Sequence, residues 1–347
     1  MSQYRFDPIR RIGVLYAPER ADRPIRIGPG AVPQSEPGPG VSVSKLDRSG
    51  RAPFAPGFEQ ETPPEVLAIR PAGSITDDPA WSLRVVPNRY PFVARRSLGD
   101  GTRDDFGKRA SEVAGFHEVV IETRDSTGDL AELDESATVD VVRAWMARLT
   151  VYRETPGIEW ACVFRNSGPL SGASLPHPHS QLVGLPYVPP QVASVRTAMD
   201  ASCRETGRCV VCREIEEAGE RTVDESEWFV AECPRVSRFP YEQRIVARRH
   251  QASVFETAVD DAAVVDLARI LSRRLRALKR VLPRLDYNLV LDAGPFPPTH
   301  SSDDGAAEHW CLEILPRTGG IAGFELVSGE WVNAVLPETA AKQFRAE

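Results

Sequence analysis

The chain has 347 residues, of which 41% are hydrophobic and 26% are charged, and its formal net charge is −7. This composition excludes wholesale disorder, and the acidic balance argues against a protein that binds nucleic-acid backbones. The sequence contains no run of 18 apolar residues, so we expect no membrane span. Its first residues lack the apolar stretch of a signal peptide, and we therefore expect a cytoplasmic protein.

The first half of the chain predicts a short series of strands around one helix. Residues 24–64 are rich in Pro and Gly, and we expect them to be irregular. Apolar residues at spacings of three and four predict a helix over residues 136–152 with one buried face. β-Branched or apolar runs predict strands at residues 82–86, 117–122 and 160–164.

Much of this order recurs in the second half. A strand at residues 243–247, a helix with a leucine stripe from Leu267 to Leu282 and a strand at residues 287–291 follow each other. We interpret the recurrence as two copies of one strand–strand–helix–strand–strand unit, with chance similarity of short segments as the alternative. The predicted class is α+β, with a mostly antiparallel sheet and flanking helices. We expect an N-terminal catalytic domain at residues 1–195 and a C-terminal domain at residues 196–347.

The most distinctive motif is His177-Pro-His179-Ser-Gln181. Alternate residues of a strand share a face, so the three polar side chains are expected to project together. A neutral imidazole is a good nucleophile toward phosphorus. The preceding loop holds Asn166 and Ser174, and its Gly, Ser and Asn residues can donate hydrogen bonds to phosphate oxygens. The alternative is a pair of structural histidines.

The stretch from Phe164 to Gln181 resembles the active-site segment of the galactose-1-phosphate uridylyltransferase family, a branch of the histidine-triad superfamily. The family pattern has Asn eleven residues and Ser three residues before the first His, as Asn166 and Ser174 stand here. Segments at residues 7–24, 62–71, 86–91 and 323–325 also resemble family segments. The resemblance therefore implies two tandem histidine-triad-like units over nearly the whole chain.

The resemblance also implies roles for individual residues. His179 is expected to be the nucleophile that takes up a nucleoside monophosphate, and the family completes each active site across a homodimer. The implied catalytic residues are His177, His179, Gln181 and Ser174. The implied substrate-binding residues are Arg20, Arg23, Asn88, Asn166, Gly172, Gly323, Phe324 and Glu325.

The expected reaction is transfer of a nucleoside monophosphate from a nucleotide sugar to a sugar 1-phosphate by double displacement. Gln181 stands where histidine-triad hydrolases carry a third His, and an amide cannot supply a proton near neutral pH. Family enzymes that use galactose 1-phosphate tend to have a lysine just before the glycine at position 323, and the stretch at residues 317–323 has none, so the resemblance argues against galactose specificity. The alternatives are a phosphorylase of ADP-glucose type or of dinucleoside polyphosphates, and a zinc-stabilised binding protein that has lost its activity.

The resemblance finally implies zinc, because many family members carry it in the N-terminal unit. Here Ala52, Ala55 and Ser126 stand at three of the four ligand positions, so we predict that this first site is lost. The second unit offers Cys209, Cys212, His250 and His309, a Cys2His2 set for one structural zinc. This arrangement resembles the ADP-glucose phosphorylase branch. A redox-active cysteine pair and two unliganded cysteines are the alternatives.

Overall fold

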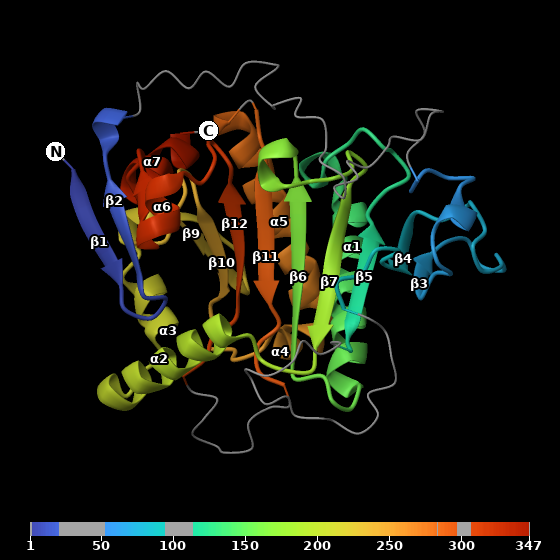
Figure 1. The fold of residues 1–347 in the computed structure, drawn as a ribbon, viewed down its shortest axis with the longest axis horizontal. Coiled ribbons are helices and arrows are strands. Elements are labelled where there is room, and N and C mark those ends of the chain that lie inside the picture. Colours follow the sequence, from blue (N-terminus) through green and yellow to red (C-terminus); the bar gives the residue numbers. More distant parts are fainter. Residues whose placement is uncertain (1, 21–52, 94–113, 283, 297–306, 347) are drawn as a thin grey trace.

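A ten-stranded antiparallel sheet forms the centre of the molecule (Figure 1). The computed structural model describes residues 2–20, 53–93, 114–282, 284–296 and 307–346. In chain order the strands of this sheet are β3 (Leu67–Ile69), β4 (Leu83–Pro87), β5 (Phe116–Ile121), β6 (Trp160–Ser167), β7 (His179–Leu185), β8 (Thr222–Glu225), β9 (Phe229–Glu232), β10 (Gln243–Ala247), β11 (Tyr287–Asp292) and β12 (Cys311–Pro316).

The order of the strands reveals the duplication. The sheet runs β3-β4-β5-β7-β6-β11-β12-β10-β9-β8. Outward from the central β6–β11 pair, each half therefore repeats the same arrangement of five strands, with β7, β5, β4 and β3 matching β12, β10, β9 and β8. The predicted repeat and the α+β class are confirmed, and the two copies share one continuous sheet rather than separate sheets.

Two long helices, α1 (Glu135–Glu154) and α5 (Asp261–Val281), cover one face of the sheet (Figure 1). The predicted apolar face of α1 is buried, including Trp145 and Leu149, and the leucine stripe of α5 is buried from Leu267 to Leu278. Both helices begin at an aspartate whose carboxylate accepts a backbone N–H of the first turn. The main hydrophobic core lies between these helices and the sheet.

The remaining elements surround the second half of the sheet. A small sheet joins β1 (Gln3–Asp7), β2 (Ile12–Tyr16) and β13 (Trp331–Asn333). The other helices are α2 (Pro190–Thr206), α3 (Val210–Glu216), α4 (Val254–Ala258), α6 (Gly323–Ser328) and α7 (Pro337–Ala346). The expected domain boundary at residues 195 and 196 lies within α2. In the described residues, no helix has both the length and the apolar character needed to cross a membrane.

Strand alternation places one row of side chains on the face that α1 does not cover. Along β6, Ala161, Val163 and Arg165 are buried, whereas Phe164 and Asn166 between and beside them are half-buried. On β7, Ser180 accepts a hydrogen bond from the indole of Trp145 of α1. His179 and Gln181 of β7 therefore lie on the opposite face, as the sequence predicts for these two residues.

Candidate active site and metal centre

His179 begins β7 and is held as a neutral imidazole. Its Nδ1 lies 2.7 Å from the carbonyl oxygen of His177, so Nδ1 carries the proton and donates it to that carbonyl. Burial lowers the pKa of His179 to about 4, although the hydrogen bond to His177 opposes the shift. At neutral pH the ring therefore keeps a lone pair on Nε2, which is the form that a nucleophile requires.

His177 precedes the strand and anchors the segment that carries His179. Its Nε2 donates to the carbonyl oxygen of Thr123 at 2.7 Å, while its buried Nδ1 has no partner among the described residues. The ring of Phe54 meets the rings of His177 and His179 edge-on, at centroid distances of 5.9 Å and 5.5 Å. The neighbour of His177 on this side is thus the aromatic ring of Phe54.

The loss of the first metal site stays a prediction, since Ala52 lies outside the described residues.

The side-chain amide of Gln181 has a fixed orientation. Gln181 Oε1 lies 2.8 Å from His117 Nε2 and accepts from Asn88 Nδ2 at 3.4 Å. The backbone N–H of Phe92 donates to His117 Nδ1 at 3.4 Å, which favours the His117 proton on Nε2, next to Gln181. Asn88 Nδ2 lies 3.0 Å from the same His117 Nε2. The backbone N–H of Tyr90 donates to Asn88 Oδ1 at 2.8 Å, which fixes the orientation of the Asn88 amide. His117 and Asn88 thus both contact the oxygen of Gln181, and the Gln181 NH2 group has no hydrogen-bond partner within the described residues.

His117 was not among the residues that the sequence predicted for the site. It lies on β5, where Val119 and Gln181 face each other across the β5–β7 pair. Burial lowers the pKa of His117, which favours the neutral ring. Only the strand register brings His117 to Gln181, and a single sequence does not reveal this register.

Asn166 lies beside the nucleophile candidate. The β6–β7 register pairs Phe164 with Gln181 and Arg165 with Ser180, so the next position places Asn166 next to His179 on the same face. The predicted Gly172 and Ser174 lie in the loop between β6 and β7, where Gly172 has a φ of +84° that favours glycine. The structure therefore gathers the motif residues and Asn88 at one end of β6 and β7.

An apolar cluster continues the same face of the sheet. Beyond Gln181, β7 presents Val183 and Leu185, and the facing positions of β6 are Cys162 and Trp160. These side chains pack with Phe164 and Val93 in one cluster. The face thus changes from polar at His179 to apolar at Leu185, which suits a ligand with a charged end and an aromatic end.

The predicted substrate-binding residues near the two termini lie away from His179 of the same chain. Arg20 lines a cavity of about 360 Å³ together with the loop at residues 318–322 and Glu325. Gly323 begins α6, and Phe324 on that helix is exposed. In Figure 1, α6 lies beside β2 at one end of the molecule, and β7 lies beyond β12, β11 and β6. Arg23 lies outside the described residues.

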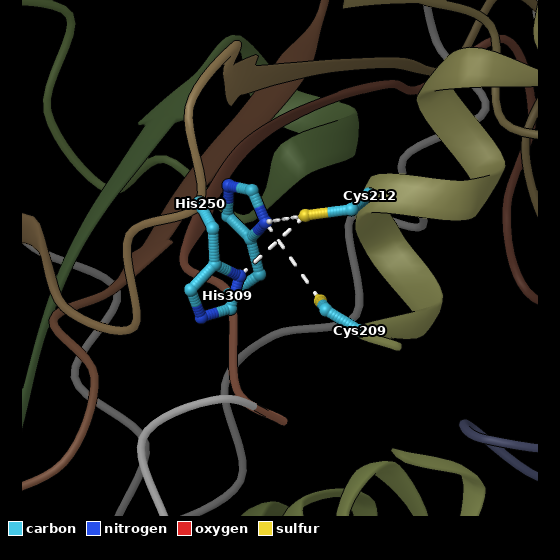
Figure 2. A group of neighbouring side chains, drawn as sticks. All are labelled: Cys209, Cys212, His250 and His309. Carbon is cyan, nitrogen blue, oxygen red and sulfur yellow. Dashed lines mark hydrogen bonds between the residues drawn. The ribbon is translucent and has the colours of Figure 1, made fainter. Parts of the chain in front are cut away.

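The predicted metal ligands come together from three parts of the chain (Figure 2). Cys209 and Cys212 lie at the start of α3, His250 follows β10, and His309 precedes β12. Their ligand atoms all lie within 4.8 Å of one another. Among the described residues this is the only such group of three or more potential ligands.

The geometry and chemistry of this group fit a tetrahedral metal ion. Cys212 Sγ lies 3.5 Å from His250 Nδ1 and 3.4 Å from His309 Nδ1, and Cys209 Sγ lies 3.9 Å from His309 Nδ1. Zinc with bonds of about 2.3 Å to sulfur and about 2.0 Å to nitrogen would separate such ligands by about 3.6 Å. The pKa of Cys209 is lowered because hydrogen bonds from the two histidines outweigh burial. The four residues therefore provide a donor set that fits a tetrahedral metal ion.

The second unit has lost the features of the first on the equivalent face. Cys311 of β12 stands where the first unit has His179, and burial raises the pKa of its thiol to about 11. Glu313 stands at the position of Gln181 and forms ion pairs with Arg10 and Arg238. Cys311 and these charged groups line a cavity of about 280 Å³. Among the described residues, the His-x-His-x-Gln pattern therefore occurs only in the first unit.

Comparisons with known proteins agree with this architecture. A family model described as "Galactose-1-phosphate uridyl transferase, N-terminal domain" matches residues 76–189. ADP-glucose phosphorylase of Arabidopsis thaliana is 31% identical over 344 residues, covering 99% of this chain and 92% of that protein. Galactose-1-phosphate uridylyltransferase of Thermotoga maritima is 27% identical, covering 76% of this chain and 84% of that protein.

A solved structure extends the similarity to three dimensions. The crystal structure of the Arabidopsis thaliana ADP-glucose phosphorylase with bound ADP-glucose superimposes with a TM-score of 0.83 at 30% identity. The match covers 100% of this chain and 99% of that one. Sequence identity at this level over nearly the full length of both chains shows a common family and not only a common fold. The chain therefore belongs to the galactose-1-phosphate uridylyltransferase family.

Proposed function

We propose that this chain is a nucleotidyltransferase that moves a nucleoside monophosphate from a nucleotide sugar to a phosphate acceptor through His179. The observation that carries the proposal is the polarity of the site. A neutral imidazole with a lone pair on Nε2 lies beside two amides, Gln181 and Asn166, whose oxygens are already engaged. A nucleophile thus stands next to donors that suit phosphoryl oxygens.

The reaction consists of two displacements at the same phosphorus. His179 Nε2 attacks the α-phosphorus, the bond to the bridging oxygen breaks, and the sugar 1-phosphate leaves. The acceptor phosphate then attacks, the P–N bond breaks, and the imidazole is released unchanged. The carbonyl oxygen of His177 accepts a hydrogen bond from His179 Nδ1, and this hydrogen bond stabilises the positive charge on the ring in the intermediate. Two inversions retain the configuration at phosphorus.

The site supports a division of the substrate along β7. The apolar cluster of Val93, Phe164, Val183 and Leu185 offers a surface for a nucleobase. The polar end at His179 offers donors for the phosphates. Asn88, whose side chain is oriented by the backbone of Tyr90, lies between the two ends and donates to Gln181.

Transfer of an adenylyl group to inorganic phosphate is the form of the reaction that the relatives favour. The Arabidopsis thaliana ADP-glucose phosphorylase matches 99% of this chain, whereas the Thermotoga maritima uridylyltransferase matches 76%. The Cys2His2 group of the second unit and the missing lysine before Gly323 support the same choice. Transfer to a sugar 1-phosphate, the reaction expected from the sequence, is the second candidate.

A screen of donors and acceptors tests the proposal. The purified protein is incubated with ADP-glucose or UDP-glucose, each with labelled phosphate or a hexose 1-phosphate. We expect labelled ADP from ADP-glucose and phosphate, with His179→Ala as the inactive control. Faster exchange between UDP-glucose and a hexose 1-phosphate would assign uridylyl transfer instead. Binding without exchange in any combination would indicate a binding protein.

Zinc is the metal that best suits the Cys2His2 group of the second unit, and its role is structural. Four protein ligands would leave no coordination position for a substrate. The group ties the start of α3 to the segments that precede β12 and follow β10. The metal thus supports the fold of the second unit, and no step of the transfer depends on it.

A homodimer would complete the site. Arg20, Gly323, Phe324 and Glu325 lie around one region of the surface, away from β7 of the same chain. The apolar residues Leu326 and Val327 are exposed on the same helix, α6. Docking of this region against the His179 face of a second copy would cover them and bring a guanidinium to the phosphates. The homodimer and a cytoplasmic location remain predictions.

Replacing Gln181 with His should shift the balance from transfer toward hydrolysis. One imidazole nitrogen would accept from His117 in place of the amide oxygen, and the other would present an N–H to the phosphoryl group. Unlike an amide, imidazole can carry a proton to or from water. We expect a shorter lifetime of the nucleotidyl intermediate in Gln181→His when no acceptor is present. An unchanged lifetime would show that residue 181 does not control water, and Gln181→Met is the control for loss of the amide hydrogen bonds without an added imidazole.

A further inference from the structure

Asn288 of the second unit contacts Asn166 of the first. Asn288 lies on β11 directly opposite Asn166 on β6, at the central strand pair of the sheet. Its Nδ2 donates to Asn166 Oδ1 at 2.8 Å and to the carbonyl oxygen of Ser171 at 3.0 Å. Its Oδ1 accepts from Arg317 Nε at 2.6 Å. The nitrogen of this buried amide thus donates two hydrogen bonds, and its oxygen accepts one.

These contacts allow only one orientation of Asn288. A guanidinium can only donate, and a backbone carbonyl can only accept. Arg317 therefore requires the oxygen of Asn288 on its side, and Ser171 requires the NH2 group on the other. Asn166 must then present its own oxygen to Asn288. Its NH2 group has no protein acceptor within the described residues, and it belongs to the face that carries His179.

We infer that Asn288 and Arg317 are positioning residues that hold the Asn166 amide with its NH2 group toward the phosphoryl group on His179. This inference rests on the proposed function. It gives the second unit a part in the reaction, although that unit has no nucleophile of its own. Neither residue needs to touch the substrate, because both act through Asn166.

The same region of the second unit holds the loop that precedes the motif. Asp286 accepts the backbone N–H of Leu170 at 2.7 Å, and Arg317 donates its backbone N–H to the carbonyl of Asp286 at 2.7 Å. Gly168 has a φ of +84°, and a Cβ there would lie 2.1 Å from the Asp286 carboxylate. The backbone of the Ser- and Gly-rich loop and the amide of Asn166 are thus held by the same short segment.

The test is a double-mutant cycle with Asn288→Asp and Asn166→Ala, read as the rate of adduct formation on His179 with ADP-glucose. The new carboxylate can offer Asn166 only acceptors, so the Asn166 amide should turn and its donor should be lost. We expect a fall of about 10²-fold, the size of a lost donor to a developing oxyanion. In the Asn166→Ala background, Asn288→Asp should change the rate less than about threefold, because the donor is already absent.

The outcomes separate this inference from the proposed function. Equal effects of Asn288→Asp in both backgrounds, or no effect at all, would overturn the positioning role. No adduct in the wild type with any nucleotide sugar would overturn the proposed function itself. If Asn288→Asp does not fold, Arg317→Gln replaces it in the cycle, with an expected loss of about tenfold. Arg276→Gln is the matched control, since Arg276 of α5 donates to the carbonyl oxygens of Ala131 and Leu133 and contacts neither Asn288 nor Asn166.

Discussion

Replacing His179 with alanine should abolish nucleotidyl transfer, with a loss of roughly 10⁴-fold or more. The ring supplies the lone pair that forms the bond to phosphorus, and the described neighbours offer no substitute. His177 directs one nitrogen to Thr123 and lies with its other nitrogen buried. His117 is occupied by Gln181 and by the backbone of Phe92. Initial rates of product formation with and without acceptor measure the effect.

Cys311→Ala is the matched control for His179→Ala. It shortens the side chain at the equivalent strand position of the second unit. Burial raises the pKa of the Cys311 thiol, so the thiol stays protonated and we expect it to take no part in nucleotidyl transfer. Its transfer rate should stay close to that of the wild type. Substantial transfer by His179→Ala would refute the covalent mechanism, whereas equal losses in both variants would point to a general effect on the fold.

Loss of the Cys2His2 metal should have the largest effect on stability. The purified protein should contain about one zinc per chain, and Cys209→Ser should reduce this to near zero. Because four residues from three segments meet at one point, removing the ion should lower the free energy of unfolding by roughly 4 kcal/mol or more. Metal analysis together with thermal unfolding measures both quantities.

Cys203→Ser makes the same chemical change on α2, outside the ligand group. It should leave both the metal content and the midpoint of thermal unfolding unchanged. A content near two would contradict the predicted loss of the first site. A content near zero after purification without chelators would contradict the assignment of the second site. Metal loss without a change in stability would mean that the group is not structural.

The architecture could be predicted from the sequence where local pattern decides it. The helical spacing around Trp145 and the leucine stripe of α5 mark the faces that pack on the sheet. The similar order of elements in both halves predicts the duplication. The small sheet was not predicted, because the three-residue strand β13 pairs with β2 across more than 300 residues of chain. Such a short strand carries almost no signal of its own.

The site could be predicted only in part, for the same physical reason. The motif identifies His177, His179 and Gln181, and the Cys-x-x-Cys spacing leads to the metal ligands. His117 reaches Gln181 only through the register of β5 with β7, and Asn288 reaches Asn166 only through the register of β6 with β11. Neither carries a motif, and each is an ordinary strand residue until its partner is known.

Detection of a nucleotidyl group on His179 tests the central claim most directly. The protein is incubated with ADP-glucose, without an acceptor, and the modified residue is located by mass spectrometry of its peptides. We expect one adenylyl group on His179, labile in acid and stable in base, that disappears when phosphate is added and ADP forms. Product formation without any adduct on His179, or with an adduct on another residue, would contradict the account.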